Sequence, residues 1–261
     1  MTTSKLFIDY FMQYVKTRLQ YRSDFFVQMV TDIMFQTVNL VFILVVFNHT
    51  THLSSWSREE VIFIYGYFLV PFSIFAAFFN LWEFNERYII KGELDRVLTR
   101  PVHSLFQVMM ETMTPESLSG ALTGMAVMGW ASWEMDLQFH WYDPLLFLLF
   151  ALGGAAIYGG LYIMLTSISL FSDSKTDIQP IMYNVGNYGR YPIDIYNKVI
   201  QIVLTWLMPF AFVGFYPASF LLHDDRWLTF AMLTPVMGFL WFALGIMVWN
   251  LGIKNYRGAG S

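Results

Sequence analysis

The sequence contains no cysteine, and only 13% of its 261 residues are charged. The lack of cysteine excludes disulfides, thiolate zinc sites and cysteine nucleophiles. A soluble domain carries about 25% charged residues, so this chain is too apolar to have water as its main solvent. The hydrophobic fraction of 56% points the same way and indicates a membrane protein.

Motifs for phosphate, metal and catalytic chemistry are also lacking. Ser174-Lys175-Thr176 has no preceding glycines to wrap a phosphate, so it is not a nucleotide-binding loop. His49 and His52 lie close together but have no further ligands nearby, and we predict no metal and no cofactor in this chain. Because no local spacing suggests catalytic residues either, we expect that the chain is not an enzyme.

Long apolar runs recur along the whole chain. A membrane-spanning helix needs about 20 mostly apolar residues. Six runs approach that length: Phe25–Phe47, Val61–Leu81, Leu118–Trp133, Pro144–Phe171, Val199–Leu222 and Trp227–Leu251. No linker or fixed-period repeat divides them. The sequence therefore predicts an all-α, polytopic membrane protein of six transmembrane helices that form a single domain over residues 1–261.

The distribution of basic residues predicts the orientation, because cytoplasmic connectors carry the excess of Lys and Arg. Of the 15 basic residues, only Arg58 and Arg226 fall in one set of connectors. The other set includes both ends of the chain and two long cytoplasmic loops, residues 82–104 and 172–198. We therefore expect a multi-pass inner (plasma) membrane protein with both termini in the cytoplasm.

The segment before the first span has an amphipathic pattern. Apolar residues such as Leu6, Tyr10 and Tyr14 recur at helical spacing, with Lys5, Asp9 and other polar residues between them. This pattern predicts an interfacial helix within residues 1–24. Such a helix is either a membrane anchor for the first span or a docking surface for a cytoplasmic partner, and the pattern does not separate the two.

Four polar residues share one face of the first span: Gln28, Asp32, Gln36 and Asn39. A carboxylate in the middle of a spanning helix costs about 2.5–3.5 kcal/mol on insertion scales, so this face should contact protein or water and not lipid. One interpretation is hydrogen bonding between helices. The other is the lining of a substrate path or a subunit interface.

Two further segments depart from simple spans or turns. Residues 82–104 mix charged and apolar residues at helical spacing, and Arg100-Pro101 ends the pattern. A short helix of this kind either lies at the headgroup interface or inserts into a groove of another protein. In the fifth span, Pro209, Gly214 and Pro217 interrupt the apolar run, which favours a broken helix that re-enters the membrane from the outer side.

Several strings of residues together resemble a known family. They are Gly92-Glu93-Leu94-Asp95 with Leu98 and Arg100-Pro101, Gly189-Arg190-Tyr191-Pro192 with Asp194, Gly214-Phe215-Tyr216-Pro217-Ala218, and the ending Trp249, Gly252, Tyr256 and Gly258-Ala259-Gly260-Ser261. On these residues the chain resembles the ABC-type-2 exporter permeases, the six-span transmembrane subunits of ABC transporters. The resemblance covers nearly the whole chain.

The resemblance implies how the chain would work. A coupling helix would seat in a cleft of an ABC ATP-binding subunit, and its residues would include Glu86, Arg87, Gly92, Glu93, Leu94, Asp95, Arg96 and Leu98. ATP and Mg would be bound by that partner and not by this chain. Pro209, Gly214, Tyr216 and Pro217 would form a short re-entrant hairpin after helix five. A second permease, either another copy or a related chain, would place the stripe around Asp32 at the centre.

We therefore expect a permease subunit of an ATP-driven exporter. Its cargo would be an amphiphilic or hydrophobic small molecule, such as a drug, antibiotic, toxin or lipid-like compound, leaving the cytoplasm or inner leaflet. No nucleic-acid partner is expected. The alternative is a secondary transporter or channel that works without an ATPase, and Asp32 is the one intramembrane carboxylate that favours it.

Overall fold

A computed structural model of the chain describes residues 12, 16, 22–171 and 179–256. Within this part the protein is all-helical and contains no β-strand. The interfacial helix predicted for residues 1–24 lies almost entirely outside the described residues. The long helices are α2 (Arg22–Phe47), α3 (Arg58–Phe78), α6 (Ser119–Glu134), α7 (Asp143–Thr166) and α11 (Leu228–Asn255).

Shorter helices connect the long ones. They are η1 (Asn85–Ile90), α4 (Glu93–Leu98), α5 (Ser104–Thr112), η2 (Pro115–Leu118), η3 (Ser167–Phe171), α8 (Gln179–Gly186), η4 (Asn187–Arg190), η5 (Ile193–Ile195), α9 (Lys198–Ile202), η6 (Val203–Leu207), η7 (Phe210–Phe212), α10 (Phe215–Leu221) and η8 (Asp225–Trp227). Of these, η1 and η6 are π-helical, and the other η elements are 3-10 helices.

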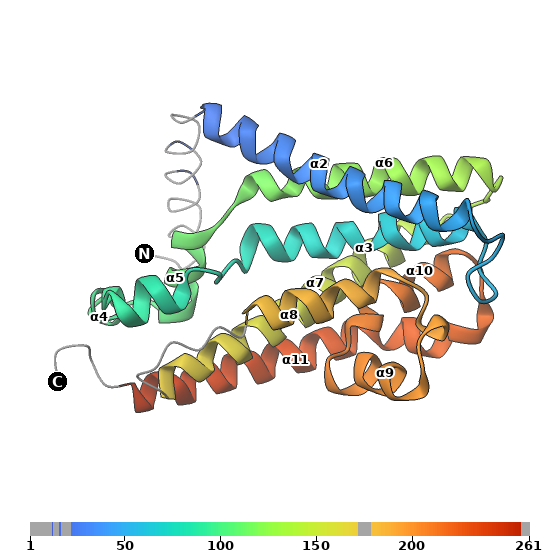
Figure 1. Cartoon of the computed structure of the whole chain (residues 1–261). Coiled ribbons are helices and arrows are strands. Elements are labelled where there is room, and N and C mark those ends of the chain that lie inside the picture. Colours follow the sequence, from blue (N-terminus) through green and yellow to red (C-terminus); the bar gives the residue numbers. More distant parts are fainter. Residues whose placement is uncertain (1–11, 13–15, 17–21, 172–178, 257–261) are drawn as a thin grey trace.

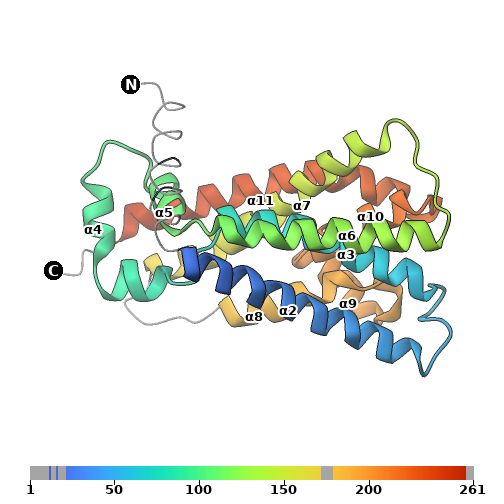
Figure 2. The same ribbon diagram turned by 90° about the horizontal axis from the view of Figure 1, so that it is seen from above.

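The long helices run side by side and give the molecule two distinct ends (Figures 1 and 2). We call one of them the α4 end, because it holds α4 and α5 together with the start of α2 and the end of α11. The other, the distal end, holds the connectors 48–57, 135–142 and 222–224. A capping box starts α3 at this end, where Ser57 and Glu60 satisfy each other's backbone N–H groups.

Among the described residues, four helices are long and apolar enough to cross a membrane: Ser23–Phe47, Arg58–Phe78, Asp143–Phe171 and Asp225–Asn255. A fifth candidate is the pair Lys198–Leu207 and Phe210–Leu221, which is bent by 76°. Helix α6 is apolar but has only 16 residues. The chain is therefore a multi-pass membrane protein with four or five candidate spans by length and composition.

The chain after α7 runs differently from the sequence-based expectation. Residues 172–198 are expected to form a connector at the α4 end, with Arg190 and Lys198 among its basic residues. In the structure, α8 packs against α7 and η4 packs against α3, and one side of each is exposed. Asp194 accepts a hydrogen bond from Trp56 Nε1 (3.0 Å) at the distal end. The apolar run Val199–Leu222 consequently begins near the distal end and bends there. A hydropathy pattern misses this path because α8 and η4 are too polar to resemble a span.

Small residues allow a close contact between α7 and α11. A Cβ on Gly160 of α7 would collide with the backbone of Trp241 in α11, and a Cβ on Gly238 would lie 2.6 Å from Gly153 O. Close backbone approach of this kind is how helices associate in a membrane, where burial from water gives no driving force. Helix α3 contributes more buried side chains to the core than any other helix among the described residues, since Val61–Pro71 are all buried.

Candidate functional site

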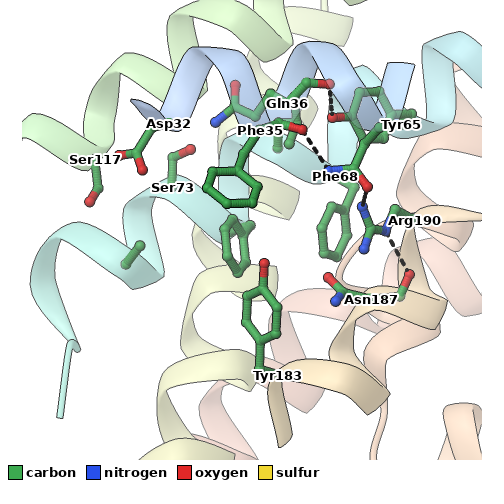
Figure 3. Close-up of a pocket in the computed structure, with 14 residues that line it drawn as sticks. Asp32, Phe35, Gln36, Tyr65, Phe68, Ser73, Ser117, Tyr183, Asn187 and Arg190 are labelled. Atoms are coloured by element: carbon green, nitrogen blue, oxygen red, sulfur yellow. Dashed lines mark hydrogen bonds between the residues drawn. The ribbon is translucent and has the colours of Figure 1, made fainter. Parts of the chain in front are cut away.

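The middle of the bundle contains a cavity of about 310 Å³ between α2, α3, η2, α8 and η4 (Figure 3). Its lining residues are Asp32, Phe35, Gln36, Asn39, Tyr65, Phe68, Leu69, Phe72, Ser73, Ala76, Ser117, Tyr183, Asn187 and Arg190. The α2 contribution runs from Asp32 to Asn39, about 10 Å along the helix axis at 1.5 Å per residue. The cavity therefore lies well inside the candidate span and away from both of its ends.

The polar face predicted on α2 is the face that lines this cavity. Asp32, Gln36 and Asn39 all reach it. Gln28 does not line the cavity, but its amide donates a hydrogen bond to Asp32 Oδ1 (3.2 Å). Gln28 therefore lies next to the cavity and orients one oxygen of the Asp32 carboxylate through this hydrogen bond.

Arg190 brings a positive charge into the same cavity. Its guanidinium donates from Nη1 to Asn39 Oδ1 (2.8 Å) and from Nε to Asn187 O (3.0 Å). Figure 3 shows Arg190 and Asp32 toward opposite sides of the cavity, with Tyr183 pointing in between them. Arg190 belongs to one of the strings that resemble the family, but no pattern in the sequence predicts it as a site residue. Its position depends on the path of η4, which no local pattern indicates.

Tyr65 and Gln36 link α3 to α2 beside the cavity. Tyr65 Oη donates a hydrogen bond to the backbone carbonyl of Gln36 (2.8 Å). The side-chain amide of Gln36 lies against Gly120 of α6, where a Cβ would come within 2.5 Å of Gln36 Nε2. The lining contains one carboxylate, one guanidinium and several neutral polar groups, an arrangement suited to binding and not to bond cleavage.

A second feature is an ionic cluster at the α4 end, centred on Glu111 of α5. Arg96 Nη2 lies 2.7 Å from Glu111 Oε2, and Tyr88 Oη donates to the same oxygen at 3.0 Å. Arg87 and Arg100 approach the carboxylate at 3.8 and 3.7 Å. Burial alone would raise the pKa of Glu111, but the hydrogen bonds from Arg96, Gln107 and Tyr88 outweigh it and hold that pKa below its usual range. The cluster joins η1, α4 and α5 into one unit.

The residues expected to form a coupling helix lie in two short helices and not in one. Gly92 separates η1 from α4 and has a φ of 72°, a left-handed conformation that glycine adopts without strain. Leu94 is fully buried, and Arg87 pairs with Glu93 (2.9 Å) inside the unit. The outward-facing positions of the predicted set are Glu86, Asp95, Arg96 and Leu98.

The bend after η6 is packed firmly into the protein. Tyr216 Oη lies 2.8 Å from Thr205 Oγ1, so a hydrogen bond joins the two limbs across the break at Met208-Pro209. A Cβ on Gly214 would collide with Gly189 O of η4. All four residues predicted for a hairpin here, Pro209, Gly214, Tyr216 and Pro217, are buried.

The family to which the chain belongs follows from its match to a protein-family model. The model of the ABC-2 family transporter protein matches residues 33–260, which is most of the chain. The chain belongs to the ABC-2 transporter family. Comparisons with curated proteins and with solved structures give no match.

Membership of the ABC-2 family agrees with the resemblance drawn from the sequence strings. A member of this family is a membrane transport subunit of an ABC transporter and is not itself catalytic. The matched range includes the cavity-lining residues of α2 from Phe35 onward, the ionic cluster at the α4 end and the bent segment, whereas Asp32 lies one residue before it.

Proposed function

We propose that this chain is the transmembrane permease subunit of an ATP-driven exporter, and that its cargo is an amphiphilic or hydrophobic small molecule. The observation that carries the proposal is the family match, combined with an outward-facing charged unit at one end and a polar cavity inside the bundle. The cargo would leave the cytoplasm or the inner leaflet.

The α4 end supports contact with an ATP-binding subunit. Ile90 (50% exposed) and Leu98 (39% exposed) present apolar side chains beside the exposed Glu86 and Asp95. Apolar anchors within a charged rim are typical of protein–protein contacts. Because the Glu111 cluster joins η1 and α4 to α5, a displacement of this surface by a partner would also move α5, and with it η2 and α6.

The cavities support an amphiphilic cargo. A second, separate cavity of about 320 Å³ lies further along α2 toward the distal end, and it is lined by apolar and aromatic residues of α2, α3 and the 188–196 segment, among them Phe42, Ile43 and Tyr191. A polar head would fit between Asp32 and Arg190, and an apolar tail beside Phe42. Both cavities lie along α2, one with charged and polar groups in its lining and the other with an apolar lining. They therefore match a molecule that has a polar part and an apolar part.

Six membrane crossings and a permease dimer complete the proposal. If α6 and the α8–η4 segment each cross the membrane, the chain returns to the α4 end, which carries Arg87, Lys91 and Lys254 and would face the cytoplasm. One side of α2 is exposed, including Phe26, Val30 and Met34. A second permease would cover this side and close the polar cavity.

The direct test is purification of the tagged chain from its native host in mild detergent, followed by mass spectrometry and an ATPase assay. We expect an ABC ATP-binding subunit to co-purify. Asp95→Lys combined with Leu98→Asp should abolish that association and leave membrane insertion intact, because both side chains face outward. Glu134→Lys, an exposed change at the distal end, is the matched control. Failure to recover an ATPase with intact, monodisperse protein would contradict the proposal.

An ATPase-independent secondary transporter is the second candidate function, and Asp32 in the cavity is the observation that favours it. A carboxylate inside a span is a common coupling group for protons or sodium. Transport by the purified chain in vesicles, driven by an ion gradient without ATP and lost in Asp32→Asn, would support this candidate against the exporter.

A further inference from the structure

Three potential metal ligands converge at the distal end, outside the features described above. They are His140 in the connector between α6 and α7, Asp143 at the start of α7, and His223 between α10 and α11. His140 Nδ1 lies 3.2 Å from His223 Nε2 and 3.6 Å from Asp143 Oδ2. The distance from His223 Nε2 to Asp143 Oδ2 is 3.9 Å.

These separations are close to those between ligands that share one metal ion. Zinc binds imidazole nitrogen and carboxylate oxygen at about 2.0–2.2 Å, so two ligand atoms at a tetrahedral angle lie about 3.3–3.6 Å apart. Two of the three pairs fall within or next to that range, and the third exceeds it by a few tenths of an ångström. Binding of an ion would replace the hydrogen bond between the His140 and His223 rings and bring His223 Nε2 closer to Asp143 Oδ2.

The surroundings hold two of the three side chains in a binding orientation. The backbone N–H of His140 donates to Asp143 Oδ2 (2.7 Å), which fixes the carboxylate, and the His140 ring stacks on Tyr142 at 8° between the ring planes. Fixed orientation of the ligands by outer contacts is a general property of protein metal sites. His223 adopts a positive φ of 61°, a conformation uncommon for residues other than glycine, in the turn between α10 and η8.

The burial pattern also fits an ion site that can be filled from solution. The Asp143 side chain is only 3% exposed, whereas those of His140 and His223 are 53% and 39% exposed. A buried carboxylate needs a positive partner, and no Lys or Arg is paired with Asp143 among the described residues. The open side toward the two histidines leaves room for water as a fourth ligand, as in zinc sites with three protein ligands.

We propose that His140, Asp143 and His223 bind a divalent transition-metal ion, with two imidazoles and one carboxylate as ligands and Zn²⁺ as the natural probe. The ion would link the α6–α7 connector to the turn after α10. It would therefore hold the bent segment against the start of α7 at the distal end. This proposal does not depend on the exporter function, because it concerns only the geometry of three side chains.

The test is zinc binding by the purified full-length chain in detergent. After treatment with a chelator, the chain is equilibrated with Zn²⁺, and bound metal is measured by mass spectrometry alongside the thermal unfolding midpoint. We expect about one Zn²⁺ per chain and a midpoint that rises with zinc concentration. His140→Ala and His223→Ala should each weaken zinc affinity by more than about 100-fold. This loss is larger than the loss expected when a residue that only orients a metal ligand is removed.

A matched control comes from the same end of the protein. His49 and His52 lie in the 48–57 connector, so His49→Ala with His52→Ala removes two imidazoles without touching the proposed ligands. This variant should bind zinc as the unchanged chain does. The proposal is overturned if the unchanged chain binds no Zn²⁺, if His140→Ala and His223→Ala bind it equally well, or if the His49 and His52 variant is the one that loses it.

Discussion

Glu111 should determine how rigidly α4 is held, and Glu111→Gln tests this. The carboxylate accepts hydrogen bonds from Arg96 (2.7 Å), Tyr88 (3.0 Å) and Gln107 (3.1 Å). The substitution keeps the shape of the side chain but removes its charge and leaves several arginines close together. Hydrogen bonds to charged groups contribute about 1.5–3 kcal/mol. Because the Arg96 side chain is 44% exposed, solvent screening favours the lower part of that range, and we expect a loss of about 2 kcal/mol.

Hydrogen–deuterium exchange of the α4 amides is the suitable assay, because local opening is governed by local stability. A loss of about 2 kcal/mol corresponds to about 30-fold faster exchange, at 1.4 kcal/mol for each factor of ten. Glu134→Gln, an exposed acidic residue at the distal end, should leave the exchange of α4 unchanged. If α4 exchanges at the same rate in Glu111→Gln and in the unchanged chain, the cluster does not stabilise this helix.

The same residue predicts a pH dependence of defined sign. The pKa of Glu111 is lowered in the folded protein, so its contribution is present above its unfolded pKa and is lost as the pH falls through its folded pKa. The difference in α4 exchange between the unchanged chain and Glu111→Gln should therefore be full at neutral pH. It should decrease as the pH falls below the unfolded glutamate pKa of about 4.3 and disappear once the pH is below the lowered pKa of the folded protein, after correction for the intrinsic exchange rate. A difference that persists in acid would show that the Glu111 charge is not its source.

Three further changes test other parts of the structure. Gly160→Leu should prevent the α7–α11 contact and destabilise the protein by about 1–3 kcal/mol or more in thermal unfolding. Gly129→Leu should be neutral, because a Cβ at Gly129 meets nothing within 4 Å. Equal effects of the two substitutions would contradict the packing described. Tyr216→Phe should remove the hydrogen bond across the bend and lower stability by about 1 kcal/mol, and an unchanged unfolding midpoint would argue against that bond. Arg190→Gln should reduce binding of an anionic amphiphile in a fluorescence titration more than that of a neutral analogue, and an equal loss for both would remove Arg190 from recognition of the polar head.

Local patterns were enough to predict several features of the site. The spacing of Asp32, Gln36 and Asn39 places them on one face of a helix, and that face lines the cavity. Leu94, by contrast, is expected from the resemblance to contact an ATP-binding subunit, and in the structure it is fully buried within the chain. Helical periodicity is a property of the backbone itself, so the shared face of α2 could be predicted without knowledge of the neighbouring helices.

The path of the chain between α7 and α10 could not be predicted in this way. A hydropathy window selects Val199–Leu222 as the fifth span, because this run is apolar. In the structure the chain reaches the distal end through α8 and η4, and Asn187 and Arg190 line the cavity beside α2 and α3. Arg190 is tolerated there because Asn39 and the Asn187 carbonyl accept its hydrogen bonds. Polar residues of this kind are recognised as part of the bundle only once their partners are known.

The sequence by itself determined that the chain is a helical, multi-pass membrane protein of the ABC-2 type, because apolar run length, helical periodicity and family strings are all local properties. Only the tertiary structure decided which distant residues meet. It joined Glu111 to Arg96, Arg190 to Asn39, and His223 to His140 and Asp143. Each of these contacts links segments of the chain that lie apart in sequence, and such contacts depend on how the helices pack and not on any pattern within one of them.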